Sequence, residues 1–315
     1  MVISHALTIK KNKDMLDFIK VYSPNKENLE NHIKSLYDVT CSADYFTREI
    51  GYPCRTYFEN IEVRFTEKYA SIRNSIHTFF NLINYNQSNN YTDFYLDDIK
   101  SAINTLSEKA GENIDDYKVT NLEFGLNIQT SLPAEKILKK NFLMYNFDGF
   151  NQIDTFKKKG YYKQYNRSEY YIKFYDKAKQ FKLPYNLLRA EIKIIDSKLL
   201  KKFGIQTVRD LTNTSILKAL FQFLLDCIEE TNIIDTFVGE NIPAKDKMFL
   251  ELGKNPSYWL ALKENKSASS YYEIRRRYNR TLSNYNLLTV KEEIKSLLIQ
   301  KFKALIQGSE YCEVA

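Results

Sequence analysis

Glycine, proline, cysteine and histidine are scarce in this chain of 315 residues, which has 9 Gly, 6 Pro, 4 Cys and 3 His. The sequence has no glycine-rich phosphate loop and no Gly-x-Gly-x-x-Gly run, which argues against a nucleotide cofactor. The cysteines lack Cys-x-x-Cys spacing and are too few for a disulfide framework, so a reducing compartment is expected. No basic-then-apolar leader and no apolar run of membrane-spanning length occur, so we expect no membrane segment.

Positive charge is concentrated in one stretch of the chain. There are 46 Lys and Arg against 39 Asp and Glu, a net charge of +7. Residues 157–182 alone hold nine basic and two acidic residues and account for the whole excess. Cations interleaved with tyrosines suit the phosphates and unstacked bases of a nucleic acid. The candidate DNA-binding residues are Lys157, Lys158, Lys159, Lys163 and Arg167, together with the helical run Arg275, Arg276 and Arg277, which is also typical of a solvated helix face.

The apolar pattern predicts an α+β fold in three parts. Apolar residues at helical spacing over 14–37, broken by Pro24, predict two helices in a helical segment 1–55. Alternating residues predict a central, antiparallel-rich sheet with helices on one face over 56–240. Residues 241–315 are expected to be helical and to bind DNA or a partner. The predicted strands are 61–65, 72–80, 119–128, 170–176 and 187–195, with a helix near 96–106.

Polar side chains share one face of the predicted strands, because successive side chains of a strand alternate between its two faces. If the strands form one sheet with helices behind it, these side chains converge on a single open face. The residues on this face are Glu123 on one strand, His77 with Arg73 and Ser75 on a second, Tyr171, Lys173 and Tyr175 on a third, and Arg189, Glu191 and Lys193 on a fourth.

Two carboxylates and one imidazole on one face suit a divalent metal with open coordination positions. Glu123, Glu191 and His77 would hold Mg²⁺ or Mn²⁺. Such an ion polarises a phosphoryl oxygen as a Lewis acid. The pattern therefore predicts chemistry at a phosphate.

A tyrosine beside such an ion is a candidate nucleophile for a phosphodiester. Lys173 and Lys177 would favour the phenolate of Tyr175 by lowering its pKa. The reaction would be a transesterification that forms a phosphotyrosine and stores the bond energy for rejoining. Tyr171, four residues earlier on the same face, is the alternative nucleophile.

Three runs of the sequence resemble the rolling-circle replication initiators of filamentous phages and related plasmids. They are Val119–Asn127 (VTNLEFGLN), Ser168–Lys177 (SEYYIKFYDK), and Leu188–Lys193 (LRAEIK) followed by Leu200–Ile205 (LKKFGI). The resemblance covers roughly residues 55–240. It implies an HUH-like nicking and strand-transfer core that cuts origin DNA at a specific site and stays linked to the 5′ phosphate.

The resemblance also implies roles for individual residues. It makes Tyr175 the nucleophile and assigns the acidic positions to Glu123 and Glu191. Together with the strand pattern, this gives a catalytic set of Tyr175, Lys173, Lys177 and Arg189, with Glu123, Glu191 and His77 as metal ligands. The paired His-hydrophobic-His that names the class is absent, so the metal shell would be rich in carboxylates. Ala190 stands where an aromatic residue is expected, which affects packing only.

The partners implied are single-stranded and origin duplex DNA, with a host helicase and DNA polymerase, in the bacterial cytoplasm. Two alternatives stay open: a non-catalytic origin-binding replication factor, and a relaxase or transposase of the same superfamily. Glu123 and Glu191 are also typical of cross-strand ion pairs with Lys173 or Lys193, and a lone His77 is more often structural.

Overall fold

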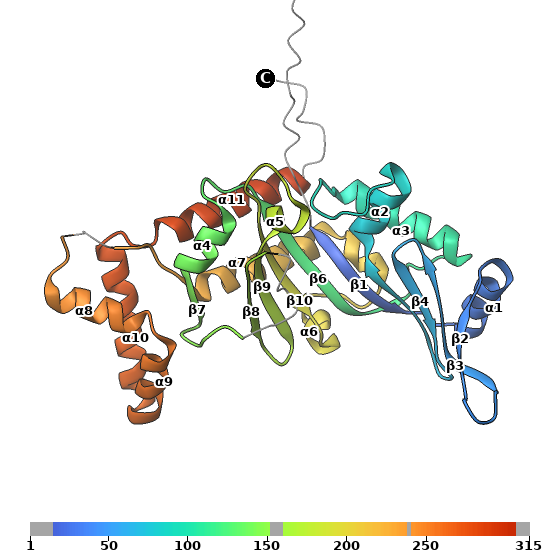
Figure 1. The fold of residues 1–315 in the computed structure, drawn as a ribbon, viewed down its shortest axis with the longest axis horizontal. Coiled ribbons are helices and arrows are strands. Elements are labelled where there is room, and N and C mark those ends of the chain that lie inside the picture. Colours follow the sequence, from blue (N-terminus) through green and yellow to red (C-terminus); the bar gives the residue numbers. More distant parts are fainter. Residues whose placement is uncertain (1–14, 152–159, 238–240, 307–315) are drawn as a thin grey trace, which may run out of the picture.

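The fold is α+β and is built on one large sheet (Figure 1). The computed structural model describes residues 15–151, 160–237 and 241–306. Within them, a nine-stranded sheet has the order β2-β3-β4-β5-β1-β6-β10-β9-β8, and a two-stranded sheet joins β11 to β7. Every pairing in the large sheet is antiparallel. The α+β class with an antiparallel central sheet, predicted from the sequence, is confirmed.

The strands and helices are interspersed along the chain up to β11, and four helices follow among the described residues. The strands are β1 (Leu16–Tyr22), β2 (Thr40–Ala43), β3 (Ile50–Phe58), β4 (Ile61–Phe65), β5 (Ala70–Ser75), β6 (Lys118–Ile128), β7 (Phe142–Tyr145), β8 (Tyr162–Asn166), β9 (Tyr170–Asp176), β10 (Leu188–Ile194) and β11 (Thr231–Ile233). The helices are α1 (Lys26–Leu36), α2 (Ile76–Tyr85), α3 (Leu96–Ala110), α4 (Ala134–Lys140), α5 (Lys177–Phe181), α6 (Ser197–Lys202), α7 (Thr214–Glu230), α8 (Ala244–Gly253), α9 (Pro256–Asn265), α10 (Ala268–Asn284) and α11 (Thr289–Ile306), with a 3₁₀ helix η2 (Val208–Thr212).

The main core lies between the apolar face of the sheet and helices that include α7 and α11. Leu122, Phe124 and Leu126 of β6 are buried in the same core as Leu220 of α7 and Leu298 of α11. Full burial of such a side chain stabilises the fold by about 1.5–3 kcal/mol. Because β6 alternates apolar and polar residues, packing this face leaves the opposite face to polar side chains.

Residues 16–22 form strand β1 in the middle of the sheet, so the helix predicted there is wrong. Leu16 and Ile19 lie opposite Phe124 and Leu122 of β6 and are buried. Leu16 and Ile19 are three positions apart on β1, whereas Phe124 and Leu122 are two positions apart on β6. β1 therefore contains a bulge. The bulge brings core-facing residues three apart, which imitates helical spacing. The second predicted helix is confirmed as α1.

Strands β2 and β3 also lie in the segment that the sequence pattern predicts to be helical. Thr56 and Phe58 of β3 are buried while their neighbours are exposed, which is the two-residue period of a strand. Cys41 and Cys54 join the two strands by a disulfide that the sequence did not predict. Among the described residues, segment 1–55 is therefore helical only at α1, and its end falls within β3.

The predicted hairpin is formed by β4 and β5, but its second strand is shorter than predicted. β5 ends at Ser75, and helix α2 begins at Ile76. The Ser75 side chain accepts a hydrogen bond from the backbone N–H of Thr78 and so caps the helix. Residues 76–80 are helical for this reason.

The last part of the chain is helical, as predicted. Helices α8, α9 and α10 lie at one end of the sheet in Figure 1 and pack around Trp259 in a second, smaller core. Helix α11 returns to the main core, where Phe302 stacks on Phe221 of α7 with ring centroids 4.0 Å apart. Among the described helices, none combines the length and the apolar character needed to cross a bilayer.

Candidate functional site

One face of the sheet gathers the polar side chains of β6, β9 and β10. Glu191 of β10 lies opposite Lys173 of β9 on one side and Gly125 of β6 on the other. Glu123 of β6 lies opposite Lys193 of β10. Neither of these two strand pairings contains a register shift, so strict alternation holds and the side chains share the face that the sequence predicts.

Glu191 is buried at the centre of an ion-pair network. Its Oε1 accepts a hydrogen bond from Lys173 Nζ at 2.8 Å, and its Oε2 accepts one from Arg189 Nε at 2.6 Å. Burial alone would raise the pKa of Glu191, but the two cations outweigh it and hold this pKa below its ordinary value. A Cβ on Gly125 would lie 2.8 Å from Glu191 Cβ, so glycine makes this close approach possible.

Lys173 bridges the two predicted acidic residues. Its Nζ donates to Glu123 Oε1 and to Glu191 Oε1, each at 2.8 Å. Glu123 also pairs with Lys193 at 2.9 Å. Burial lowers the pKa of Lys173, but the Glu191 and Glu123 carboxylates raise it above its ordinary value, so the ammonium stays charged. The cross-strand ion pairs left open by the sequence are therefore formed.

Asp17 of β1 completes the cluster, and the sequence analysis missed it. Its carboxylate accepts hydrogen bonds from Ser75 Oγ and from Asn90 Nδ2, the latter at 2.6 Å, and lies 3.7 Å from Arg189 Nη2. The bulge in β1 places Asp17 on the polar face between two core-facing residues. The signal was the run Phe18–Tyr22, whose aromatic and β-branched residues are typical of a strand.

Asp17, Glu123 and Glu191 could hold a divalent metal. One carboxylate oxygen from each lies within 4.8 Å of the others. Carboxylate oxygens are the hard ligands that suit Mg²⁺ or Mn²⁺, so the donor set fits such an ion. The three negative charges are matched by three cations that contact them, and the Lys173 ammonium holds the position between Glu123 and Glu191.

Tyr175 lies within this cluster and is only 7% exposed. Its hydroxyl donates to Glu191 Oε2 at 3.3 Å, and Lys177 Nζ lies 5.4 Å from the centre of its ring. Burial, and after it the Glu191 carboxylate, raise the pKa of Tyr175 well above the ordinary value of tyrosine. The expectation that Lys173 and Lys177 favour the phenolate is therefore wrong, because Lys173 is held by two carboxylates and burial penalises the charged ring.

The connection between α2 and α3 covers part of the face that was expected to be open. Asn90 donates from Nδ2 to Asp17 and accepts at Oδ1 from Lys177 Nζ at 2.7 Å. The Tyr91 ring packs against Phe181 of α5, with centroids 4.9 Å apart. Asn90 therefore joins an acidic and a basic member of the cluster above the sheet.

Tyr171, the alternative nucleophile, lies four residues before Tyr175 on β9. It is opposite Lys193 of β10 and Asn166 of β8, and it is half-buried. Alternation places it on the same face as Tyr175, but it is the Tyr175 hydroxyl that donates a hydrogen bond to Glu191. The contacts with the acidic cluster thus favour Tyr175.

His77 is placed outside the acidic cluster. It is the second residue of α2 rather than a strand residue, its Nε2 lies 3.1 Å from Thr92 Oγ1, and its ring is stacked on Phe94 with centroids 4.6 Å apart. Within the described ranges, the group of residues that could hold a metal contains Asp17 and not His77. The prediction misplaced His77 because alternation no longer applies once β5 has ended.

The predicted DNA-binding cations are dispersed over the molecule. Lys163 of β8 lies opposite Phe174, so its side chain is on the face away from Tyr175, and its Nζ lies 5.3 Å from the Phe150 ring centre. Arg167 lies over two tyrosine rings of its own chain. On α10, Arg275 lies over Phe147, Arg276 pairs with Glu273, and Arg277 lies over Phe249. Lys157, Lys158 and Lys159 lie outside the described residues.

Comparison with known proteins gives one class of match. No protein-family model and no curated protein matches the chain. Among solved structures, the chain is similar to that of a rolling circle replication initiator protein from Geobacillus stearothermophilus, with a TM-score of 0.39 and 13% sequence identity. The match covers 74% of this chain and 89% of that chain.

Proposed function

We propose that the chain initiates rolling-circle DNA replication by nicking single-stranded origin DNA, with Tyr175 as the nucleophile. The observation that carries this proposal is a tyrosine hydroxyl hydrogen-bonded to a carboxylate within a cluster of acidic and basic groups on one face of a sheet. The three runs that resemble such initiators supply this cluster, since Glu123, Tyr175 and Glu191 each lie in one of them.

The reaction is an exchange of ester bonds. Tyr175 Oη attacks the phosphorus of a phosphodiester and forms a 5′-phosphotyrosine, while the bond to O3′ breaks. The phenolic proton leaves as the bond forms, and O3′ gains a proton, so the reaction needs no other reactant. Glu191 Oε2, 3.3 Å from Oη, orients the hydroxyl, and Arg189 and Lys173 offer positive charge beside the phosphate oxygens.

Asp17, Glu123 and Glu191 would hold the metal, with Asp17 in the place predicted for His77. A bound Mg²⁺ or Mn²⁺ would supply Lewis-acid polarisation of a phosphoryl oxygen. The three carboxylates lie on the strands β1, β6 and β10, and these neighbouring strands are hydrogen-bonded to one another. Such a framework keeps the ligands in position without the ion.

In this role the chain would bind single-stranded and duplex origin DNA in the bacterial cytoplasm, and a host helicase and polymerase would extend the freed 3′ hydroxyl. Residues 241–315 would bind DNA or a partner through α8, α9 and α10, since α11 packs in the main core. Tyr175 is nearly covered, so neighbouring side chains would have to move for a phosphodiester to reach it.

A covalent adduct on a denaturing gel tests the proposal. The wild-type chain is incubated with Mn²⁺ and a randomised single-stranded DNA labelled at its 3′ end, because the adduct retains the 3′ fragment. We expect a labelled protein band that EDTA abolishes. Tyr175→Phe should still bind DNA and give no band, whereas the matched control Tyr171→Phe should give the wild-type yield. A normal adduct with Tyr175→Phe would transfer the role to Tyr171.

A non-catalytic origin-binding factor is the second candidate, favoured by the burial of Tyr175 and by the pairing of the acidic cluster with cations. In that case the sheet would bind DNA but not cut it. Wild-type protein that binds labelled single strands, yet gives neither cleavage nor adduct with Mn²⁺, would support this alternative.

A further inference from the structure

The polar face that carries the acidic cluster continues across the other half of the sheet. Phe18 of β1 lies opposite Ser75 of β5, whose hydroxyl contacts Asp17, so both halves present the same face. Beyond β1, a first row of directly opposed residues runs through Lys20, Arg73, Glu62 and Tyr57. A second row runs through Tyr22, Ser71, Arg64, Arg55 and Thr40.

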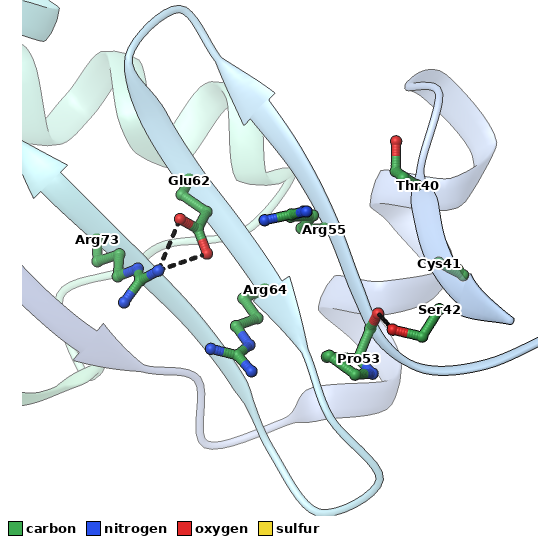
Figure 2. A pocket seen from close by; sticks show the side chains of 8 residues that line it. All are labelled: Thr40, Cys41, Ser42, Pro53, Arg55, Glu62, Arg64 and Arg73. Atoms are coloured by element: carbon green, nitrogen blue, oxygen red, sulfur yellow. Dashed lines mark hydrogen bonds and ion pairs between the residues drawn. The ribbon is translucent and has the colours of Figure 1, made fainter. Parts of the chain in front are cut away.

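Arginines line a hollow of about 190 Å³ on this half of the face (Figure 2). Arg73 is held by Glu62, whose carboxylate oxygens lie 2.8 and 2.9 Å from its Nη2. Arg55 and Arg64 lie opposite each other on β3 and β4. In the part of the chain that the structure describes, neither has an acidic partner, and Figure 2 draws no contact from either guanidinium. Two adjacent guanidinium groups without a counter-ion repel each other and attract an anion.

Aromatic side chains flank these arginines. Tyr57 is 51% exposed and lies two residues from Arg55 on the same face of β3. Tyr69, in the turn between β4 and β5, is also exposed, and it lines a second hollow together with Arg64. Exposed rings among unpaired cations suit bases stacked on rings and phosphates bound by guanidinium groups.

We propose that Arg55 and Arg64, with Lys20 and Tyr57, form a track that binds the backbone and bases of single-stranded DNA and leads it to the Tyr175 cluster. Its identity as a DNA track rests on the proposed function. Four strand spacings separate Glu191 on β10 from Arg64 on β4, which is about 19 Å at about 4.8 Å per strand. Single-strand-binding surfaces hold segments of about 4–16 nucleotides, and one such segment can span this distance.

The cations continue between the two ends of the track. Lys193 lies beside the acidic cluster on β10, and Lys20 of β1 lies opposite both Asn121 of β6 and Arg73 of β5. Lys118 of β6 lies opposite Tyr22 on this face, so every strand from β10 to β3 places a basic side chain there. A phosphate backbone can thus cross the sheet perpendicular to the strands without meeting an uncompensated carboxylate.

Fluorescence anisotropy with labelled oligo(dT) tests the track, in EDTA so that no cleavage occurs. Arg55→Gln combined with Arg64→Gln should raise the Kd at least about tenfold at low salt. It should also reduce the slope of log K against log salt by about 1.4, or 0.7 for each lost phosphate contact. Lys100→Gln combined with Arg209→Gln removes two exposed, ion-paired cations elsewhere and is the matched control.

Arg55→Lys combined with Arg64→Lys keeps the charge and should recover the salt slope, which separates loss of phosphate contacts from misfolding. A Kd and slope in the Gln pair equal to those of the control pair would overturn the track, and an acidic protein segment would then be the better occupant. Wild-type protein that binds through these arginines but forms no adduct with Mn²⁺ would leave the track standing and refute the proposed function instead.

Discussion

Replacing Glu191 by glutamine should destabilise the protein by about 3–5 kcal/mol, the usual loss when one partner of a buried ion pair is removed. Both carboxylate oxygens of Glu191 accept hydrogen bonds from cations, Oε1 from the partly buried Lys173 and Oε2 from the buried Arg189. A glutamine offers one oxygen and one NH₂ group. Whichever way it turns, it sets a donor against a cation, so the loss exceeds that of a single hydrogen bond.

Glu135 provides a matched control at the protein surface. Its two oxygens also pair with two lysines, Lys139 and Lys179, but all three side chains are partly or largely exposed. Exposed pairs contribute about 0–1 kcal/mol, so Glu135→Gln should cost little. The two substitutions therefore remove the same number of ion pairs but differ in burial, and Glu191 also loses the hydrogen bond from Tyr175.

The free energy of unfolding is measured by urea titration with linear extrapolation, in EDTA so that no metal contributes. The expected difference between Glu191→Gln and Glu135→Gln is at least about 2 kcal/mol, from the ranges of buried and exposed pairs. Equal losses in the two variants would refute the reasoning, because the network around Glu191 would then be no stronger than a surface pair.

Two further predictions concern the same cluster. Lys173→Met leaves Glu123 and Glu191 without their bridging cation. Because the interaction of two unit charges 4 Å apart is about 4 kcal/mol at an effective dielectric constant of 20, Mn²⁺ should bind at least about tenfold more tightly, measured by calorimetry. Unchanged affinity would place the metal elsewhere. Gly125→Ala puts a Cβ 2.8 Å from Glu191 Cβ and should cost about 1–3 kcal/mol in urea unfolding, whereas Gly51→Ala, which meets no atom within 4 Å, should cost clearly less.

Regular alternation explains why part of the site was predictable from the sequence. β9 and β10 pair without a register shift, and so do β10 and β6, so side chains two residues apart share a face. Tyr175, Lys173 and Glu191 were grouped correctly for this reason. Where polar and apolar residues alternate regularly, the sequence shows which side chains share a face even when the neighbouring strands are unknown.

The same rule fails where a strand is interrupted. The bulge in β1 hid Asp17, because an extra residue gives a strand the apolar spacing of a helix. His77 was misplaced because a serine cap ends β5 two residues earlier. The net charge of a stretch also does not indicate which face of the sheet each basic side chain occupies. Lys163 and Lys173 belong to the same basic stretch but project from opposite faces of the sheet.

Asn90 satisfies two opposite charges with one side chain, as donor to Asp17 and as acceptor from Lys177. An aspartate here would set two carboxylates against each other, and a lysine would face a second ammonium, so a primary amide is the group that suits both neighbours. Position 90 should therefore tolerate change only in step with positions 17 and 177. In related chains, coupled substitution at these three positions would be the evolutionary trace of this contact.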